Sequence, residues 1–201
     1  MPKINPEIEA FARIKVVGIG GSGKNAVNHM ISSKVRGVDF IAINTDAQDL
    51  HHSLAKHRIH IGKNLTRGLG TGMDPELGRK AAEENVEEVQ NVIKGADMVF
   101  IAGGTGGGTL SGAGPFVSKV AKDLGALVVA VVTKPFFFEG SQRMQIAERA
   151  IEELKKENVN PISIVYRAKH LYSIWKKLVR NEMNIERIMD LVAMKIILHT
   201  V

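Results

Sequence analysis

The sequence contains no cysteine and few aromatic residues, with one tryptophan and two tyrosines among 201 residues. The absence of cysteine excludes disulfide bonds and thiolate metal sites. The longest uninterrupted apolar run, residues 126–132, is far too short to cross a bilayer, and the N-terminal residues lack the apolar core of a signal peptide. These absences favour a cytoplasmic protein without direct membrane insertion.

The composition is that of a globular protein. Hydrophobic residues make up 44% and charged residues 24% of the chain, which is ordinary for a folded domain. The length suits one large domain, or a domain with an extension. The net charge is +6, and residues 161–201 carry seven Lys or Arg against three Asp or Glu. Because the basic character is concentrated in this tail, we expect no nucleic-acid partner.

The chain is organised around a glycine-rich stretch, residues 103–115, in which seven of thirteen residues are glycine. It follows an apolar run at 98–102 that is typical of a buried parallel strand, and it precedes a helical pattern that begins at Phe116. A glycine loop between a strand and a helix presents backbone N–H groups and a helix N-terminus to an anion. The stretch therefore predicts a phosphate-binding segment.

Strand and helix patterns alternate along the chain. Strands are predicted at 13–17, 38–43, 58–61, 97–102, 127–132 and 162–165, and helices from the first glycine loop to 33, at 74–94, from 116 and at 140–157. This alternation predicts an α/β fold, a three-layer Rossmann-like parallel sheet with helices on both faces. Ligands bind at the carboxyl ends of such strands, where the loops 18–25, 44–48, 103–115 and 133–143 lie. The segment 62–74 is also predicted as a loop, and the loop at 68–75, which precedes a helix, could join this site.

The chain changes character near residue 160. The last of its twenty glycines is Gly140, whereas both tyrosines and the tryptophan lie beyond 160. We expect an N-terminal arm at residues 1–12, the α/β domain at 13–165, and a tail at 166–201 formed by one or two amphipathic helices.

The first glycine loop, residues 18–25, permits several interpretations. Gly18, Gly20 and Gly23 after a strand match the dinucleotide-binding fingerprint, and Asp46 could then hold a ribose. Residues 18–24 also match the phosphate loop of P-loop NTPases, although Asn25 stands where the magnesium-binding hydroxyl belongs. A third interpretation rests on a family and includes the second glycine stretch as well.

Residues 106–112, Gly-Gly-Gly-Thr-Leu-Ser-Gly, resemble the GGGTGTG signature of the tubulin/FtsZ family. Residues 20–26 resemble the first phosphate loop of that family, GGxGxNA. Further segments resemble it in the same order, namely 38–48, 68–75, 95–102 and 131–140 with Arg143. The resemblance covers roughly residues 13–157, and only this interpretation accounts for both glycine loops.

The resemblance implies a GTP-binding, filament-forming cytoskeletal GTPase of bacterial cell division that acts in septal ring assembly. It also implies a nucleotide site in three parts. The phosphate and base side would be formed by Gly20, Gly21, Gly23 and Asn25. The phosphates would be surrounded by Gly106, Gly107, Gly108, Thr109, Leu110, Ser111 and Gly112, and the ribose by Thr133, Pro135, Glu139 and Arg143.

The same resemblance implies GTP or GDP as ligand, with Mg²⁺ held mainly by phosphates and water. It implies head-to-tail assembly of like subunits, with division-ring proteins as partners, in the cytoplasm at the division site. Hydrolysis would occur where a neighbouring subunit contributes acidic residues. The loop that supplies them and the second domain would lie beyond residue 201, so we expect a truncated nucleotide-binding domain and assign no catalytic residue.

Three departures from the family stand out. Leu110 replaces a signature glycine. If that position requires a left-handed backbone, leucine there costs roughly 1–2 kcal/mol. On that condition we expect Leu110→Gly to strengthen phosphate binding. The Pro-Asn-Asp-Lys turn expected near 165–168 is missing, and no guanine-binding Asn or Asp is matched near 189–193. Two alternatives therefore stay open: an NAD(P)-dependent oxidoreductase, and a catalytically dead module that caps filaments of this family.

Overall fold

A computed structural model describes residues 12–157, 163–168 and 192–197. The chain divides into two units, Met1–Pro161 and Ile162–Val201, which are described separately. Most of the expected N-terminal arm, residues 1–11, lies outside the described residues.

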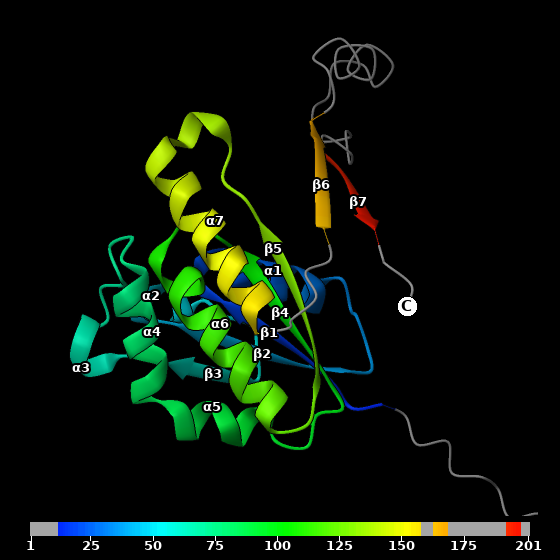
Figure 1. Cartoon of the computed structure of the whole chain (residues 1–201). Coiled ribbons are helices and arrows are strands. Elements are labelled where there is room, and N and C mark those ends of the chain that lie inside the picture. Colours follow the sequence, from blue (N-terminus) through cyan, green and yellow to red (C-terminus); the bar gives the residue numbers. More distant parts are fainter. Residues whose placement is uncertain (1–11, 158–162, 169–191, 198–201) are drawn as a thin grey trace, which may run out of the picture. The chain divides into compact units, whose positions relative to one another are not determined.

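Five parallel strands form the sheet of the first unit (Figure 1). They are β1 (Ile14–Ile19), β2 (Val38–Asn44), β3 (His57–His60), β4 (Met98–Gly104) and β5 (Leu127–Thr133), in the order β3-β2-β1-β4-β5. All five lie close to the predicted residues, because each is a short run rich in β-branched and apolar side chains. The central strand β1 pairs with β2 and β4, so the loops that follow these strands meet at one edge.

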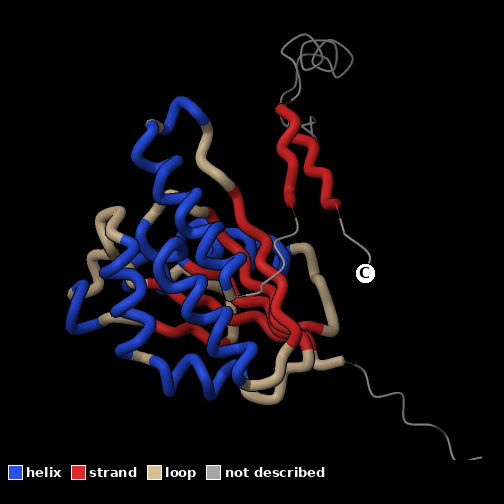
Figure 2. The backbone as a smooth tube through the Cα atoms, viewed as in Figure 1, coloured by secondary structure: helices blue, strands red, loops and turns tan. Residues whose placement is uncertain are grey.

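Helices cover both faces of this sheet (Figure 2). One face carries α1 (Gly20–Ser32) and α2 (Ala47–His51), whose Val27 and Leu50 pack against Val16 and Ala42 of the strands. The other face carries α4 (Pro75–Glu84), α5 (Val86–Ile93), α6 (Gly108–Asp123) and α7 (Ser141–Lys156). The predicted three-layer α/β fold with a parallel sheet is therefore confirmed.

The single helix predicted at 74–94 is in fact two helices, which meet at Asn85. The side chain of Asn85 accepts a hydrogen bond from the backbone N–H of Gly62 at 2.9 Å and donates one to Glu88 at 3.0 Å. Because Asn85 holds the start of the 62–74 segment, the helix is interrupted there. That segment was predicted as a loop, and it contains the short helix α3 (Lys63–Thr66).

Helix α6 begins at Gly108, well before the predicted start at Phe116, and it includes Pro115. Its glycines allow a close approach to α4: a β-carbon added to Gly112 would lie only 1.9 Å from the carbonyl oxygen of Pro75. Packing between two helices thus outweighs the poor intrinsic helix propensity of glycine and proline.

In the second unit, β6 (Ser163–Ala168) pairs with β7 (Val192–Ile197) in antiparallel orientation. The strand predicted at 162–165 is therefore confirmed and is longer than expected. The helical prediction is wrong for residues 192–197, since the short apolar run Val-Ala-Met-Lys-Ile-Ile fits either period and pairs here with β6. Residues 169–191, for which helix was also expected, lie outside the described part of the chain.

Candidate functional site

The two glycine-rich segments meet at the carboxyl edge of the sheet. The hydroxyl of Ser22, in the first segment, accepts a hydrogen bond from the backbone N–H of Gly104 at 2.6 Å. Gly20 has a left-handed backbone with φ of +72°, and a β-carbon added to it would lie 3.5 Å from Cβ of Thr109. The contact follows from the sheet order, because β1 and β4 are neighbours and each leads into one of the two segments.

Helices α1 and α6 both begin at this edge without a side-chain cap. Among the described residues, neither N-cap residue, Ile19 or Gly107, makes a capping side-chain hydrogen bond, and neither helix has an acidic residue in its first turn. In contrast, the carboxylates of Asp46 and Asp74 cap α2 and α4. The first backbone N–H groups of α1 and α6 are thus left to bind an anion, and the helix dipoles favour negative charge there.

Three threonine hydroxyls lie together at the start of α6. Oγ1 of Thr109 is 2.8 Å from Oγ1 of Thr45 and 3.4 Å from Oγ1 of Thr71. Thr45 and Thr71 are buried. Of these three, the sequence analysis named only Thr109 as a site residue. It placed Thr45 in the candidate binding loop 44–48 at the carboxyl edge and gave it no role.

The segment that follows β5 lies on the other side of Gly106. The carbonyl of Thr133 accepts hydrogen bonds from the backbone N–H of Thr105 at 2.9 Å and from its hydroxyl at 2.6 Å. A β-carbon on Gly106 would lie 3.1 Å from Cγ of Pro135 and 3.0 Å from the carbonyl oxygen of Arg143. Thr133, Pro135 and Arg143, which were expected at the ribose, are thus adjacent to the glycine-rich stretch 103–115.

Glu139 and Arg143 form an ion pair with each other at 3.1 Å across one turn of chain. The second carboxylate oxygen of Glu139 also accepts the backbone N–H of Phe136 at 2.8 Å. Both side chains stay partly exposed. The ion pair thus holds both side chains in place and leaves them accessible to solvent.

Leu110 does not have the strained backbone considered from the sequence. It lies in the first turn of α6, and the non-glycine residues with positive φ in the described ranges are Lys34, Arg67 and Met73. Its side chain is 3% exposed and belongs to the main core cluster. Leu110 is therefore a packing residue, and the condition for a left-handed strain at this position is not met.

The glycines of the signature stretch serve different purposes. A β-carbon on Gly108 would lie 2.4 Å from Oγ1 of Thr71, and one on Gly112 would meet the backbone of Pro75, so both allow α6 to approach α4 and the loop before it. A β-carbon on Gly107 would meet no described heavy atom within 4 Å. The structure thus places Gly107 at the open edge and Gly112 in a helix contact.

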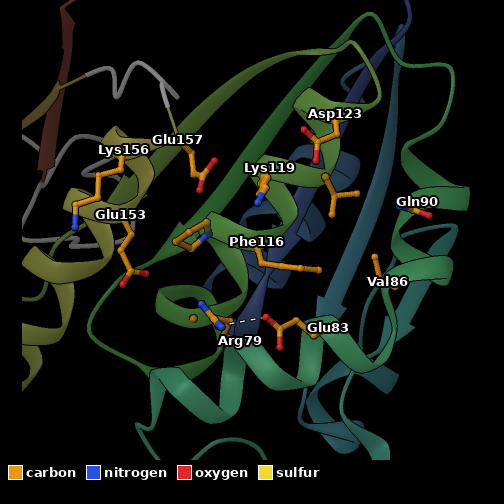
Figure 3. Close-up of a pocket in the computed structure, with 13 residues that line it drawn as sticks. Arg79, Glu83, Val86, Gln90, Phe116, Lys119, Asp123, Glu153, Lys156 and Glu157 are labelled. Carbon is orange, nitrogen blue, oxygen red and sulfur yellow. Dashed lines mark ion pairs between the residues drawn. The ribbon is translucent and has the colours of Figure 1, made fainter.

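A pocket of about 590 Å³ lies among α4, α5, α6 and α7 (Figure 3). It is lined by Arg79, Glu83, Val86, Gln90, Gly112, Pro115, Phe116, Lys119, Val120, Asp123, Glu153, Lys156 and Glu157. Figure 3 shows Arg79 directed at Glu83, with which it forms an ion pair at 3.2 Å. Gly112 and Pro115 of α6 thus line a pocket between helices.

Lys24 and Asp46 bear on the alternatives for the first glycine loop. Nζ of Lys24 lies 2.6 Å from Oδ1 of Asp49, and Lys24 is only 6% exposed, whereas a P-loop lysine would extend to the phosphates. Oδ1 of Asp46 accepts the backbone N–H of Asp49 at 2.9 Å, so this carboxylate is a helix cap in place of a free ribose ligand. Both contacts count against the P-loop and dinucleotide interpretations.

The family model described as "Tubulin/FtsZ family, GTPase domain" matches residues 13–176. The chain belongs to the tubulin/FtsZ family. The match extends beyond residue 157, where the sequence resemblance was thought to end, and it covers both glycine segments. Membership in this family supports the guanine-nucleotide interpretation over the dinucleotide one.

Two curated proteins, each named cell division protein FtsZ, are similar to this chain. Cell division protein FtsZ of Buchnera aphidicola subsp. Acyrthosiphon pisum is 55% identical over 150 residues, which cover 75% of this chain and 39% of that protein. The FtsZ of Buchnera aphidicola subsp. Schizaphis graminum is 52% identical over 158 residues, which cover 79% of this chain and 41% of that protein. The chain thus spans about two fifths of the length of these relatives.

Solved structures of the family share the fold. An empty FtsZ dimer from M. jannaschii matches with a TM-score of 0.72 and 48% identity, over 73% of this chain and 43% of that one. CetZ2 from Haloferax volcanii, a GTPgS-bound protofilament, matches with a TM-score of 0.66 and 26% identity, over 72% of this chain and 46% of that one.

Proposed function

We propose that this chain binds GTP or GDP at the carboxyl edge of its sheet, as the nucleotide-binding part of a filament-forming GTPase of cell division. The observation that carries the proposal is the meeting of two uncapped helix starts, α1 and α6, in a chain of the tubulin/FtsZ family. Unpaired N–H groups and two helix dipoles suit a polyphosphate, whose charge is spread over several oxygens.

The phosphates would contact Gly20, Gly21 and the segment from Gly106 to Ser111. On this proposal Gly107 gives the closest backbone approach, because the space beside it is open. The ribose would lie against Thr133 and Pro135, with Glu139 accepting a hydroxyl proton in a hydrogen bond and Arg143 orienting that carboxylate. Asn25, which is exposed on α1, would face the base side.

Magnesium would accompany the nucleotide. Its preferred ligands are hard oxygens, and it keeps several waters when bound with phosphates. The hydroxyls of Thr45, Thr71 and Thr109 are oxygens of this kind, whereas no group of three or more His, Asp or Glu side chains that could hold an ion occurs in the described ranges. The ion would neutralise phosphate charge, and these threonines would orient its waters.

The proposal includes assembly. The M. jannaschii FtsZ is described as a dimer and the Haloferax CetZ2 as a protofilament. We propose head-to-tail assembly of like subunits, with hydrolysis aided by acidic residues of a neighbouring subunit, and division-ring proteins as partners in the cytoplasm at the division site. No helix in the ranges that the structure describes has the length and apolar character to span a membrane.

The direct test is to purify the chain, denature it, and identify any released nucleotide by chromatography. The proposal expects GDP or GTP at close to one equivalent, and calorimetry on the emptied protein should show that GTP binds again. A protein that releases no nucleotide and takes up neither GTP nor GDP would contradict it. Stronger binding of NAD than of GTP would restore the oxidoreductase alternative.

Gly107→Ala tests where the phosphates bind. The added methyl group meets no protein atom within 4 Å, and the φ of Gly107 is −95°, so folding should be retained while GTP affinity falls. Gly37→Asn is a matched control, because Gly37 lies before β2 at the opposite edge and asparagine tolerates its φ of +79°. Equal GTP affinity in both variants and the wild type would place the phosphates elsewhere.

A further inference from the structure

A partly buried ion pair lies beside the start of α1. Nζ of Lys24 is 2.6 Å from Oδ1 of Asp49, and the two side chains are 8% and 30% exposed. The other carboxylate oxygen of Asp49 accepts a hydrogen bond from Nδ2 of Asn44 at 2.8 Å. Asp49 is thus held by one cation and one amide.

The carboxylate of Asp49 faces the first glycine loop. Oδ2 lies 3.4 Å from the position of a β-carbon on Gly21, and Gly21 belongs to the uncapped first turn of α1. This turn is one of the two proposed phosphate contacts. A bare carboxylate here would repel the phosphates, whereas a carboxylate paired with a lysine presents no net charge.

Asp49 also takes part in fixing the turn that follows β2. Oδ1 of Asn44 accepts the backbone N–H groups of Thr45 at 2.8 Å and Asp46 at 3.3 Å, while its amide nitrogen is engaged by Asp49. Thr45 in turn contacts Thr109 of α6 through their hydroxyls. The contacts therefore run from Lys24 through Asp49 and Asn44 to the threonine cluster.

We propose that Lys24 and Asp49 are positioning residues that set the charge and shape of the phosphate-binding edge. Asp49 anchors the turn that carries Thr45, and Lys24 neutralises Asp49 so that a nucleoside di- or triphosphate can approach α1. Lys24 acts through Asp49 and does not itself contact phosphate. This inference rests on the proposed function and names the charge balance that the site requires.

The test uses Lys24→Met, Asp49→Asn and the double variant, with GTP and GDP titrated by calorimetry at low and high salt. Lys24→Met leaves an uncompensated carboxylate, so GTP affinity should fall about fivefold or more at low salt. The loss should be larger for GTP than for GDP and should shrink as salt screens the charge. Asp49→Asn keeps an oxygen for Asn44 and removes the negative charge, so GTP affinity should be equal or higher.

The double variant restores neutrality and should bind GTP within about twofold of the wild type at both salt concentrations. If the pair were only structural, both single variants would lose affinity alike, independently of salt and in step with their melting temperatures. That result, or wild-type GTP affinity in Lys24→Met, would overturn the inference.

A single variant that leaves one charge of this partly buried pair without its partner can fail to fold, because the remaining charge is poorly solvated. In that case the double variant is the test. GTP binding close to that of the wild type supports the inference, and strongly reduced binding in a folded protein overturns it. Failure of the proposed function is distinguishable, because the wild type itself would then bind no GTP or GDP, and the inference would fall with it.

Discussion

The two halves of the glycine-rich stretch have similar compositions and different surroundings. In the first half, a β-carbon added to Gly107 would meet no described heavy atom within 4 Å, although one on Gly106 would lie 3.0 Å from the carbonyl oxygen of Arg143. From Gly108 onward the same kind of sequence is helical, and Gly112 lies against the backbone of Pro75 in α4. The same residue type thus has different surroundings in the two halves: Gly107 borders open space, which the proposed phosphates would occupy, and Gly112 borders another helix.

The largest effect is expected from Leu110→Gly. Removing a buried leucine side chain costs about 3 kcal/mol, and glycine in a helix adds about 1 kcal/mol, so the free energy of unfolding should fall by about 4 kcal/mol in urea titrations. This expectation replaces the one based on backbone strain. Leu110→Met, which conserves volume, is the control; a Leu110→Gly protein as stable as the wild type, with tighter GTP binding, would restore the strain hypothesis.

Gly112→Ala should have the next largest effect. The added carbon would lie 1.9 Å from the carbonyl oxygen of Pro75, so α4 and α6 must separate, at a cost of about 3 kcal/mol. Gly107→Ala in the other half should change the unfolding free energy by no more than about 1 kcal/mol. Urea titration measures the free energy of unfolding of both variants. Equal destabilisation would contradict the distinction between a packed Gly112 and an open Gly107.

Ser118→Ala extends the test further along α6. The Ser118 side chain is fully buried, and its hydroxyl has no hydrogen-bond partner among the residues described. Replacing it with a methyl group removes an unsatisfied polar atom and should stabilise the protein by about 1 kcal/mol. Thermal denaturation measures this, with the exposed Ser33→Ala as control; a clear loss of stability would indicate a bonding partner for this hydroxyl.

The smallest effect is expected at the opposite, amino edge of the sheet. There the guanidinium of Arg13 hydrogen-bonds Asp97 and, together with the Arg13 backbone N–H, holds the pKa of Asp97 below its ordinary value of 3.8. Because the folded-state pKa is lowered, the pair stabilises the fold above that value, and the contribution is lost as the pH falls through the lower, folded-state pKa.

The denaturation midpoints of wild type and Asp97→Asn should therefore differ slightly at neutral pH and converge in strong acid. The difference should be small because the pair is exposed to solvent. GTP affinity should be unchanged, which would set this edge apart from the carboxyl edge. A difference that grows as the pH falls below 3.8 would contradict the sign of the pKa shift.

The strands could be predicted because their signal is local. Each of the five is a run of apolar residues bounded by turn residues, and burial on both faces requires such a run. The helix boundaries were less predictable, since the break at Asn85 depends on a hydrogen bond to Gly62 and the start of α6 depends on contact with α4. Strand β7 was missed because its short apolar run fits a helix equally well.

The candidate site was predicted in part. The glycine segments were found from their composition and spacing, and the residues after β5 from the family resemblance. The structure places Gly20 beside Thr109, and Pro135 and Arg143 beside Gly106. Thr45 lay in a predicted binding loop, but its contact with Thr109 was missed because the two residues lie far apart in the sequence. The Lys24–Asp49 pair was missed because its members lie on different elements. Leu110 was placed in a loop, whereas it packs in the core.

The sequence by itself determined the parallel sheet, the two glycine segments and their position after β1 and β4, since these depend on local apolar runs and on backbone freedom. Only the tertiary structure decided which glycines face open space and which face another helix. It also decided that Lys24 pairs with Asp49, and that α1 and α6 begin side by side without caps. These features depend on distances between elements, which no local pattern encodes.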